Sequence, residues 1–317
     1  MPPVDLQSEG SAPSGRLLSH SNDPSTQDEQ ALTAVRARLL RDEAHTPERL
    51  DALLCLVDAM STFELGRFLL HNRGLNAHWA HQMVTYQPGT LARDTAPMLE
   101  HALFERIPLL VATRHRFGIF QHQLQALLRP GMTLVSVACG FMGELLMLDY
   151  RHCPDVRLLG TDLDPQALDG ARALARQRGL EHLVSLQLQD AWEAGEPGSA
   201  DVLTSNGLNI YEPDDARVLA LYRVFFDWLR PGGTLVTSFL TPPPQRSDQS
   251  PWKLEAVDAS NWHLQELLTK VSPPSVTFRT QAQTLELLQR AGYGDVTFID
   301  DPVGVFPTVV ARKPPAA

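Results

Sequence analysis

The stretch VSVACGFMGELL, residues 135–146, joins a short apolar run to a turn of small residues and then to a run with helical character. Small residues suit a backbone that turns sharply after a strand and lets a ligand approach, because a Cβ atom hinders that approach. Ala138, Gly140 and Gly143 nearly reproduce the G-x-G-x-x-G spacing of a nucleotide-binding turn, and Asp162 lies where such sites hold a ribose hydroxyl. The stretch therefore predicts a nucleotide site.

The chain around this turn alternates apolar runs with helical stretches. The runs fall at residues 132–138, 156–161, 184–189, 201–205 and 233–240. This pattern is typical of a mostly parallel sheet covered by helices on both faces. Residues 280–313 predict a helix followed by two strands joined by a short turn, and such strands must pair antiparallel. We therefore expect an α/β fold with a Rossmann-like seven-stranded sheet, mostly parallel, with an antiparallel C-terminal strand.

Three ranges differ in character along the chain. Residues 1–28 are rich in Ser, Pro, Gly, Asp and Gln, which predicts a disordered tail. Residues 29–129 show apolar spacing typical of helices and predict an all-helical cap region. Residues 130–317 form the predicted α/β domain. Helix starts are indicated by a capping box at Ser61–Glu64 and by N-cap residues at Asn76 and Asp164, and a further helix is expected to begin near residues 213–215.

The charge of the chain and its cysteine content argue against several kinds of partner, cellular compartment and binding site. The chain has 317 residues and a formal net charge of −10, which disfavours binding to nucleic acid and to anionic membranes. Its three cysteines show no CxxC spacing, and no apolar run approaches roughly 18 residues. These features predict a cytoplasmic protein without a membrane segment. His78 and His81 lie three residues apart, but no third ligand has matching spacing, so no metal site is predicted.

With all segments in place, the chain resembles the class I S-adenosylmethionine-dependent methyltransferases over residues 131–313. Five stretches carry the resemblance, in the family's order and spacing: LVSVACGFMGELL (134–146), LLGTDLDPQALDGARALA (158–175), LQLQDAW (186–192), DVLTSNGLNIYEPDD (201–215) and WLRPGGTLVTSFL (228–240). The antiparallel pair at the C-terminal end is also a feature of this family rather than of NAD enzymes.

The resemblance implies that S-adenosyl-L-methionine is the cofactor. It assigns Ala138, Cys139, Gly140 and Gly143 to the turn beside the methionyl part, Asp162 to the ribose hydroxyls, Leu163, Asp190 and Ala191 to the adenine, and Asn206 and Gly207 to the border of the sulfonium. Ribose hydroxyls and the adenine amino group are hydrogen-bond donors, so carboxylates are suitable acceptors at these positions.

The same resemblance predicts a small-molecule substrate, methylated at an O, N or C nucleophile by in-line transfer. Tyr211 and Asn209 lie where family members bring polar side chains to the methyl-transfer site, and they are the catalytic candidates. A turn-stabilising role for Asn209 and a packing role for Tyr211 are the alternatives. Trp252, in a proline-rich loop after the fifth strand, either walls the substrate pocket or packs against its own surface loop.

Two other functions stay open from the sequence. Ser136 stands where the family has an acid, and Ala138 stands where it has a glycine, which leaves room for a non-catalytic protein that binds S-adenosylmethionine. An NAD-dependent oxidoreductase is favoured only by the spacing of Ala138, Gly140 and Gly143. The acceptor atom and the oligomeric state are not determined by the sequence.

Overall fold

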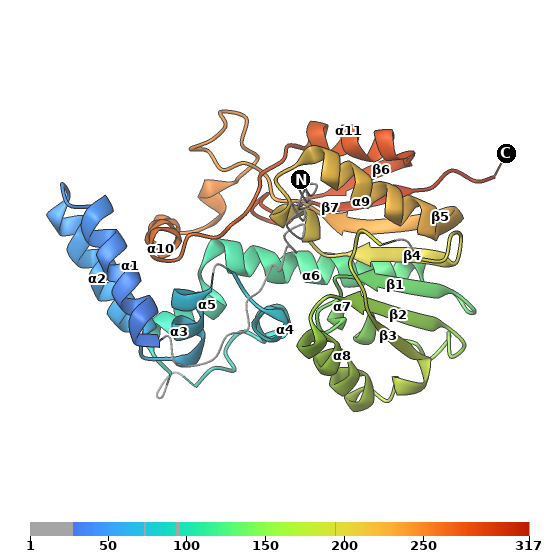
Figure 1. Cartoon of the computed structure of the whole chain (residues 1–317), viewed down its shortest axis with the longest axis horizontal. Helices are drawn as coiled ribbons and strands as arrows, with labels where there is room; N and C mark the ends of the chain where they lie inside the picture. The colour runs from blue at the N-terminus through green and yellow to red at the C-terminus, as the bar shows by residue number, and fades with distance from the viewer. Residues whose placement is uncertain (1–27, 73, 93–95, 194, 317) are drawn as a thin grey trace, which may run out of the picture.

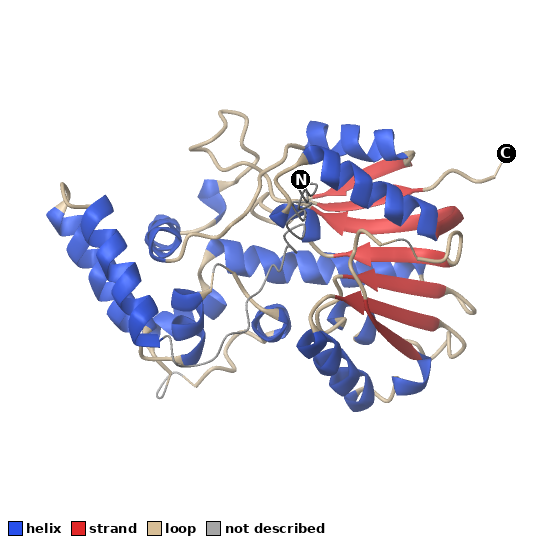
Figure 2. Ribbon diagram, viewed as in Figure 1, coloured by secondary structure: helices blue, strands red, loops and turns tan. Residues whose placement is uncertain are grey.

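The computed structural model describes residues 28–72, 74–92, 96–193 and 195–316. The predicted tail, residues 1–28, lies outside these ranges except for Asp28, where the first helix begins. A sheet covered by helices lies beside a separate group of helices (Figure 2).

The sheet has seven strands in the order β3-β2-β1-β4-β5-β7-β6. Their bounds are β1 Thr133–Val137, β2 Arg157–Asp162, β3 Val184–Leu188, β4 Ala200–Ser205, β5 Leu229–Ser238, β6 Gly294–Ile299 and β7 Thr308–Arg312. Strands β1 to β5 pair in parallel, and β7 pairs antiparallel with both β5 and β6. The predicted fold class is confirmed. The connection between the last two strands is longer than the predicted short turn, because residues 300–307 form a loop that closes on the Asp301 carboxylate.

Alternating side chains along the central strands build two cores, one on each face of the sheet. Leu134 of β1 and Val202 of β4 pack in a cluster with α6, α7 and α8, whereas Val135 and Leu203 pack with α9 and α11. This alternation follows from the period of two along a strand. The helices concerned are α6 Pro108–Leu127, α7 Gly143–Leu146, α8 Pro165–Gln177, α9 Asp215–Trp228 and α11 Gln281–Ala291.

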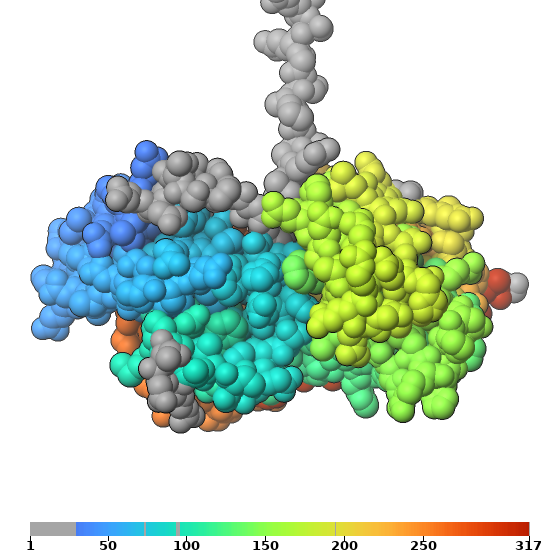
Figure 3. All heavy atoms as spheres, turned by 90° about the horizontal axis from the view of Figure 1, so that it is seen from below, coloured from blue at the N-terminus to red at the C-terminus, as the bar shows by residue number. Residues whose placement is uncertain are grey.

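The remaining helices form a helical layer beside the sheet (Figure 1). They are α1 Asp28–Asp42, α2 Pro47–Met60, α3 Glu64–His71, α4 Ala77–Thr85, α5 Met98–Glu105 and α10 Ala259–Val271. Leu268 and Val271 of α10 belong to the same apolar cluster as α2 and α3. The helical layer thus draws on residues from both sides of the predicted boundary at residues 129 and 130. Seen from below, its atoms lie directly against those of the α/β part (Figure 3).

Long helix α6 connects the two parts, because it packs on the sheet through Phe120 and Leu124 and extends into the helical layer (Figure 1). Within the described residues, no helix combines the length and apolar character needed to cross a bilayer.

Helix starts agree with the sequence at three of four sites. The predicted capping box at Ser61–Glu64 is wrong: α3 begins after Phe63, which makes no side-chain cap. The hydroxyls of Ser61 and Thr62 instead donate to the carbonyls of Asp58 and Ala59, because they lie beside the last turn of α2. The predicted N-caps are confirmed at Asn76 and Asp164, and the helix expected near residues 213–215 begins after Asp214. Each of these three side chains accepts a backbone N–H at its helix start.

Replacing Phe225 with alanine tests the core under α9. Its ring is fully buried against the sheet, so Phe225→Ala is expected to lower the free energy of unfolding by about 3–5 kcal/mol. Arg223→Ala, on the exposed side of the same helix, is the control and is expected to change it by less than about 0.5 kcal/mol. Chemical denaturation measures both, and equal effects would show that this face does not form the core.

Candidate active site

The turn after β1 is held by the carboxylate of Asp162. The N–H of Gly140 donates to one carboxylate oxygen at 2.8 Å, and the N–H of Asp164 donates to the other at 2.9 Å. Ala138 and Gly140 adopt φ of 52° and 53°, a region that favours glycine. Ala138 therefore keeps the backbone shape of the glycine that it replaces. Burial raises the pKa of Asp162, and the backbone N–H groups oppose that effect.

Ser136, which stands where the family has an acid, is in contact with a buried acid from another part of the chain. Ser136 Oγ donates to Glu144 Oε1 at 2.5 Å, and both side chains are buried. Glu144 comes from α7, eight positions after Ser136, and burial raises the pKa of its carboxyl group. Sequence reasoning missed Glu144, although a lone acid in the apolar run FMGELL was a usable signal. A buried acid from the next helix thus lies beside Ser136, near the end of β1.

The donor and acceptor set at this edge of the sheet fits an adenosyl group. A carboxylate accepts up to about four hydrogen bonds, so Asp162 keeps capacity for hydroxyl donors beyond its two backbone partners. Asp190 accepts the N–H of Trp192 at 3.0 Å and likewise retains an oxygen for an amino donor. Leu163 is half-buried and Ala191 is buried, which gives the apolar surroundings that an adenine ring requires.

A cavity of about 770 Å³ opens at the carboxyl ends of β1, β4 and β5. Its sheet side includes Ala138, Asn206, Gly207 and Tyr211, and its other walls come from the helical layer and from the loop after β5. Trp252 lines the cavity, as predicted, and its ring stacks on Trp262 with centroids 5.6 Å apart. The cavity therefore brings residues predicted to border the methyl donor together with a catalytic candidate.

The two catalytic candidates lie in different places. Tyr211, in the short 3₁₀ turn Leu208–Tyr211, lines the cavity, and burial raises the pKa of its hydroxyl. Asn209 is buried in the core. Its side-chain Nδ2 donates to the Tyr222 hydroxyl at 3.1 Å, and its backbone carbonyl accepts from the Arg279 guanidinium. The expected catalytic role of Asn209 is corrected to a structural one, because its amide is committed to the core under α9.

Helix α4 covers the turn after β1. The His81 ring lies 5.2 Å from the Phe141 ring, between centroids, and a Cβ atom built on Gly143 lies 3.0 Å from His81 Nδ1. A larger residue than glycine at position 143 would therefore require the His81 ring of α4 to shift by a few tenths of an ångström. Burial lowers the pKa of His81, with a smaller contribution from His78. Among the described residues, no group of three or more His, Cys, Asp or Glu side chains is placed to hold a metal ion.

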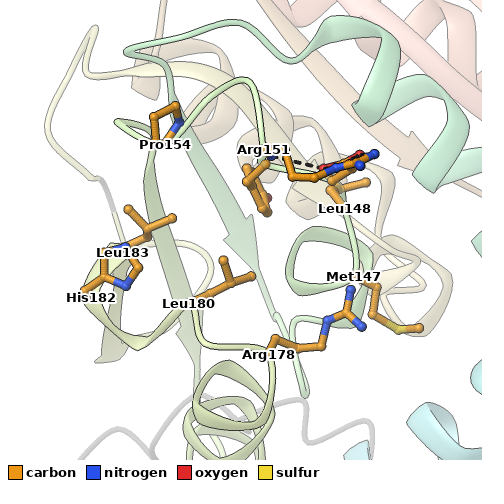
Figure 4. Close-up of a pocket in the computed structure, with 10 residues that line it drawn as sticks. Met147, Leu148, Arg151, Pro154, Arg178, Leu180, His182 and Leu183 are labelled. Atoms are coloured by element: carbon orange, nitrogen blue, oxygen red, sulfur yellow. Dashed lines mark hydrogen bonds and ion pairs between the residues drawn. The ribbon is translucent and has the colours of Figure 1, made fainter.

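A second hollow, of about 560 Å³, lies at the opposite edge of the sheet, before β2 and β3 (Figure 4). Arg151, Arg178 and His182 line it, and Arg151 pairs with Asp149. It is separate from the turn that Asp162 holds, since that turn lies at the carboxyl ends of the strands.

The chain is similar to known proteins over the part of the sheet that holds this site. The family model described as a methyltransferase domain matches residues 135–233. A solved structure from Bordetella parapertussis, described as a possible exported protein, is 47% identical with a TM-score of 0.83, covering 92% of this chain and 100% of that one.

Two curated plant relatives match a shorter part of the chain. Phosphoethanolamine N-methyltransferase 1 of Arabidopsis thaliana is 32% identical over 112 residues, which is 35% of this chain and 21% of the relative. Phosphoethanolamine N-methyltransferase of Triticum aestivum is 28% identical over 124 residues, 38% of this chain and 23% of the relative. The matched region thus spans less than a quarter of the length of these relatives.

The raised pKa of Glu144 predicts a pH-dependent stability. Because its folded-state pKa lies above the usual value of a glutamate side chain, protonation favours the folded state, and stability is lost as the pH rises through the raised pKa. Glu144→Gln removes this loss, so its melting temperature should gain on the wild type as the pH rises from about 4.5 to 8. Glu286→Gln, at an exposed site of α11, is the control. A difference between wild type and Glu144→Gln that is independent of pH would contradict the assignment.

Proposed function

We propose that this chain, which belongs to the class I S-adenosylmethionine-dependent methyltransferases, methylates a small molecule held in the cavity beside Ala138 and Asn206. The cofactor of this family, S-adenosyl-L-methionine, supplies a methyl group on a sulfonium, which is a good leaving group. The protein then has to align a nucleophile with the methyl group and exclude water. The observation that carries the proposal is the cavity that joins the end of β1 to the end of β4.

In this proposal, the residues at the sheet edge contact three parts of the cofactor. Asp162, Leu163, Asp190 and Ala191 hold the adenosyl part, and the turn Ala138–Gly143 holds the methionyl part, with Asn206 and Gly207 bordering the sulfonium. Glu144, hydrogen-bonded to Ser136, takes the place of the family's acid in organising the methionyl ammonium. This buried acid removes the main ground for a protein that binds the cofactor without turnover. The methyltransferase-domain match favours S-adenosylmethionine over NAD.

Tyr211 orients the nucleophile in this proposal. Burial raises the pKa of its hydroxyl, so the group is neutral at pH 7 and acts as a hydrogen-bond donor or acceptor rather than as a base. An amine that is already neutral needs no base, and a hydroxyl nucleophile has to lose its proton to another group or to water.

A cavity of about 770 Å³ and a net charge of −10 support a small-molecule substrate over nucleic acid. The named plant relatives act on phosphoethanolamine, which is also a small molecule. We place the cap at residues 29–129 with α10 added, and the methyltransferase domain in the rest of residues 130–317. Cys55, Cys139 and Cys153 are free, which favours the cytoplasm, although the Bordetella protein is described as a possible exported protein.

Asp162→Asn tests the ribose site. The amide keeps the size of the side chain but loses charge-assisted hydrogen bonds to the ribose hydroxyls, each worth about 1.5–3 kcal/mol. Calorimetry should show S-adenosylhomocysteine binding weakened by roughly 10-fold or more. Asp169→Asn, on the exposed face of α8, should bind as the wild type does. Unchanged affinity in Asp162→Asn, with a normal melting temperature, would refute the site.

Tyr211→Phe separates substrate chemistry from cofactor binding. The variant should bind S-adenosylhomocysteine normally but transfer labelled methyl groups to a small-molecule extract about tenfold more slowly, the equivalent of one lost hydrogen bond. Tyr86→Phe, in the helical layer, is the matched control. Equal transfer rates in Tyr211→Phe and the wild type would assign Tyr211 a packing role.

A further inference from the structure

We propose that the cavity selects acceptors that carry a carboxylate, and that Arg116 of α6 binds this group. The proposal rests on the methyl-transfer function above and names the substrate class of the same cavity.

Arg116 is a buried cation that lines the cavity with an unsatisfied donor. Its side chain is 8% exposed, and its guanidinium carbon lies 4.6 Å from the centroid of the Phe306 ring. Nη1 donates to Ser238 Oγ at 3.3 Å, whereas Nε is buried without a hydrogen-bond partner. An unpaired buried donor is costly, and more so when it is charged, so a ligand oxygen that accepts from Arg116 relieves part of that cost.

The other charged side chains of the cavity wall already have counter-charges. Lys270 pairs with Glu43 at 2.5 Å, and Glu266 pairs with Arg49 at 2.7 Å. Across the part of the chain that the structure describes, Arg116 forms no ion pair. Arg116 is therefore the one charged side chain of the cavity wall without an ion-pair partner among the described residues, which favours an anionic ligand.

Two titratable groups lie close enough to interact electrostatically with Arg116, the Tyr211 hydroxyl, which is neutral at pH 7, and the Asp301 carboxylate. The Asp301 carboxylate accepts the N–H groups of Val303 and Phe306, so it serves its own loop. Burial lowers the pKa of Arg116 to about 10, which leaves the guanidinium charged at neutral pH.

A carboxylate matches this site better than a phosphate or an ammonium. A guanidinium presents planar N–H donors that suit a carboxylate, and one cation balances one negative charge. A phosphate monoester, which carries close to two charges at pH 7, leaves a buried negative charge without a partner. The surrounding wall is apolar, with Leu110, Ile210 and Leu240 among its residues. An apolar body with a single carboxylate is therefore the favoured acceptor.

The anchor lies close to the residues that border the methyl donor. Ser238 Oγ accepts from Arg116 and also lies 3.5 Å from Asn206 Oδ1, to which it donates. One side chain thus separates the carboxylate site from Asn206. We expect the methylated atom to lie within a few bonds of the carboxylate.

Calorimetry on the full-length protein, saturated with S-adenosylhomocysteine, tests the proposal. The probes are 4-phenylbutyrate, octanoate and indole-3-propionate, each compared with its amide and with the amine and phosphate monoester of the same skeleton. At least one carboxylate should bind about tenfold more tightly than its amide, amine and phosphate counterparts. Binding of no carboxylate, or preference for the amide, the amine or the phosphate, would overturn the proposal.

Three variants locate the effect. Arg116→Met should abolish the preference for the carboxylate over the amide, and Arg116→Lys should retain part of it. Arg114→Met is the matched control, because Arg114 lies on the same helix, donates to the Phe104 carbonyl and is absent from the cavity wall. An undiminished preference in a folded Arg116→Met protein would contradict the proposal. If Arg116→Met does not fold, the proposal is tested by the wild-type preference for carboxylates and by its reduction in Arg116→Lys. An undiminished preference in Arg116→Lys would then contradict the role of Arg116.

The same samples separate this inference from the proposed function. S-adenosylhomocysteine should bind equally to the wild type and all three variants. Cofactor binding without carboxylate preference would refute only the role of Arg116. Arg116-dependent carboxylate binding without cofactor binding would refute the methyl-transfer function.

Discussion

The Asp162 carboxylate is the interaction on which the site depends. It accepts the N–H of Gly140, after β1, and the N–H of Asp164, after β2, and so fixes the ends of two neighbouring strands relative to each other. Because the turn includes Ala138 and Gly140 at positive φ, the backbone needs an acceptor that holds this shape. Loss of the carboxylate would therefore affect both the nucleotide contacts and the edge of the cavity.

Helix α6 connects this sheet edge to the substrate cavity. Its C-terminal half packs on the sheet through Phe120 and Leu124, and its N-terminal half places Leu109, Thr113 and Arg116 in the cavity wall. The rigid packing on the sheet fixes where the guanidinium lies. Helix α4 covers the turn from the other side, through the contact of His81 with Phe141 and Gly143. The helical layer thus contributes to the walls of the proposed active site.

Local signals in the sequence were sufficient for the fold. The apolar runs predicted the strands. The caps at Asn76 and Asp164 and the residues around Asp214 predicted helix starts. The order of the motifs predicted the Rossmann-like α/β fold. These features depend on neighbours in the chain or on the period of a strand. The capping box at Ser61–Glu64 failed because the end of α2 offered nearer acceptors for the two hydroxyls.

The site was less predictable where contacts join distant parts of the chain. The turn, Asp162 and Tyr211 were nominated from motif positions, whereas Glu144 meets Ser136 only after α7 folds back on β1. No local signal in the sequence distinguishes Arg116 from the other residues of its helix, because its burial and its place in the cavity wall depend on tertiary packing. Asn209 was misassigned because its partner, Tyr222, lies on the next helix. Packing of α10 on α2 is likewise a tertiary contact without a local signal.

The central claim is that the turn after β1 holds S-adenosyl-L-methionine. Parallel calorimetric titrations of the protein with S-adenosylmethionine, S-adenosylhomocysteine and NAD test it most directly. The arrangement of Asp162, Asp190 and Glu144 predicts saturable binding of the two sulfur nucleotides and none of NAD. Binding of NAD alone, or of none of the three by a folded protein, would contradict it.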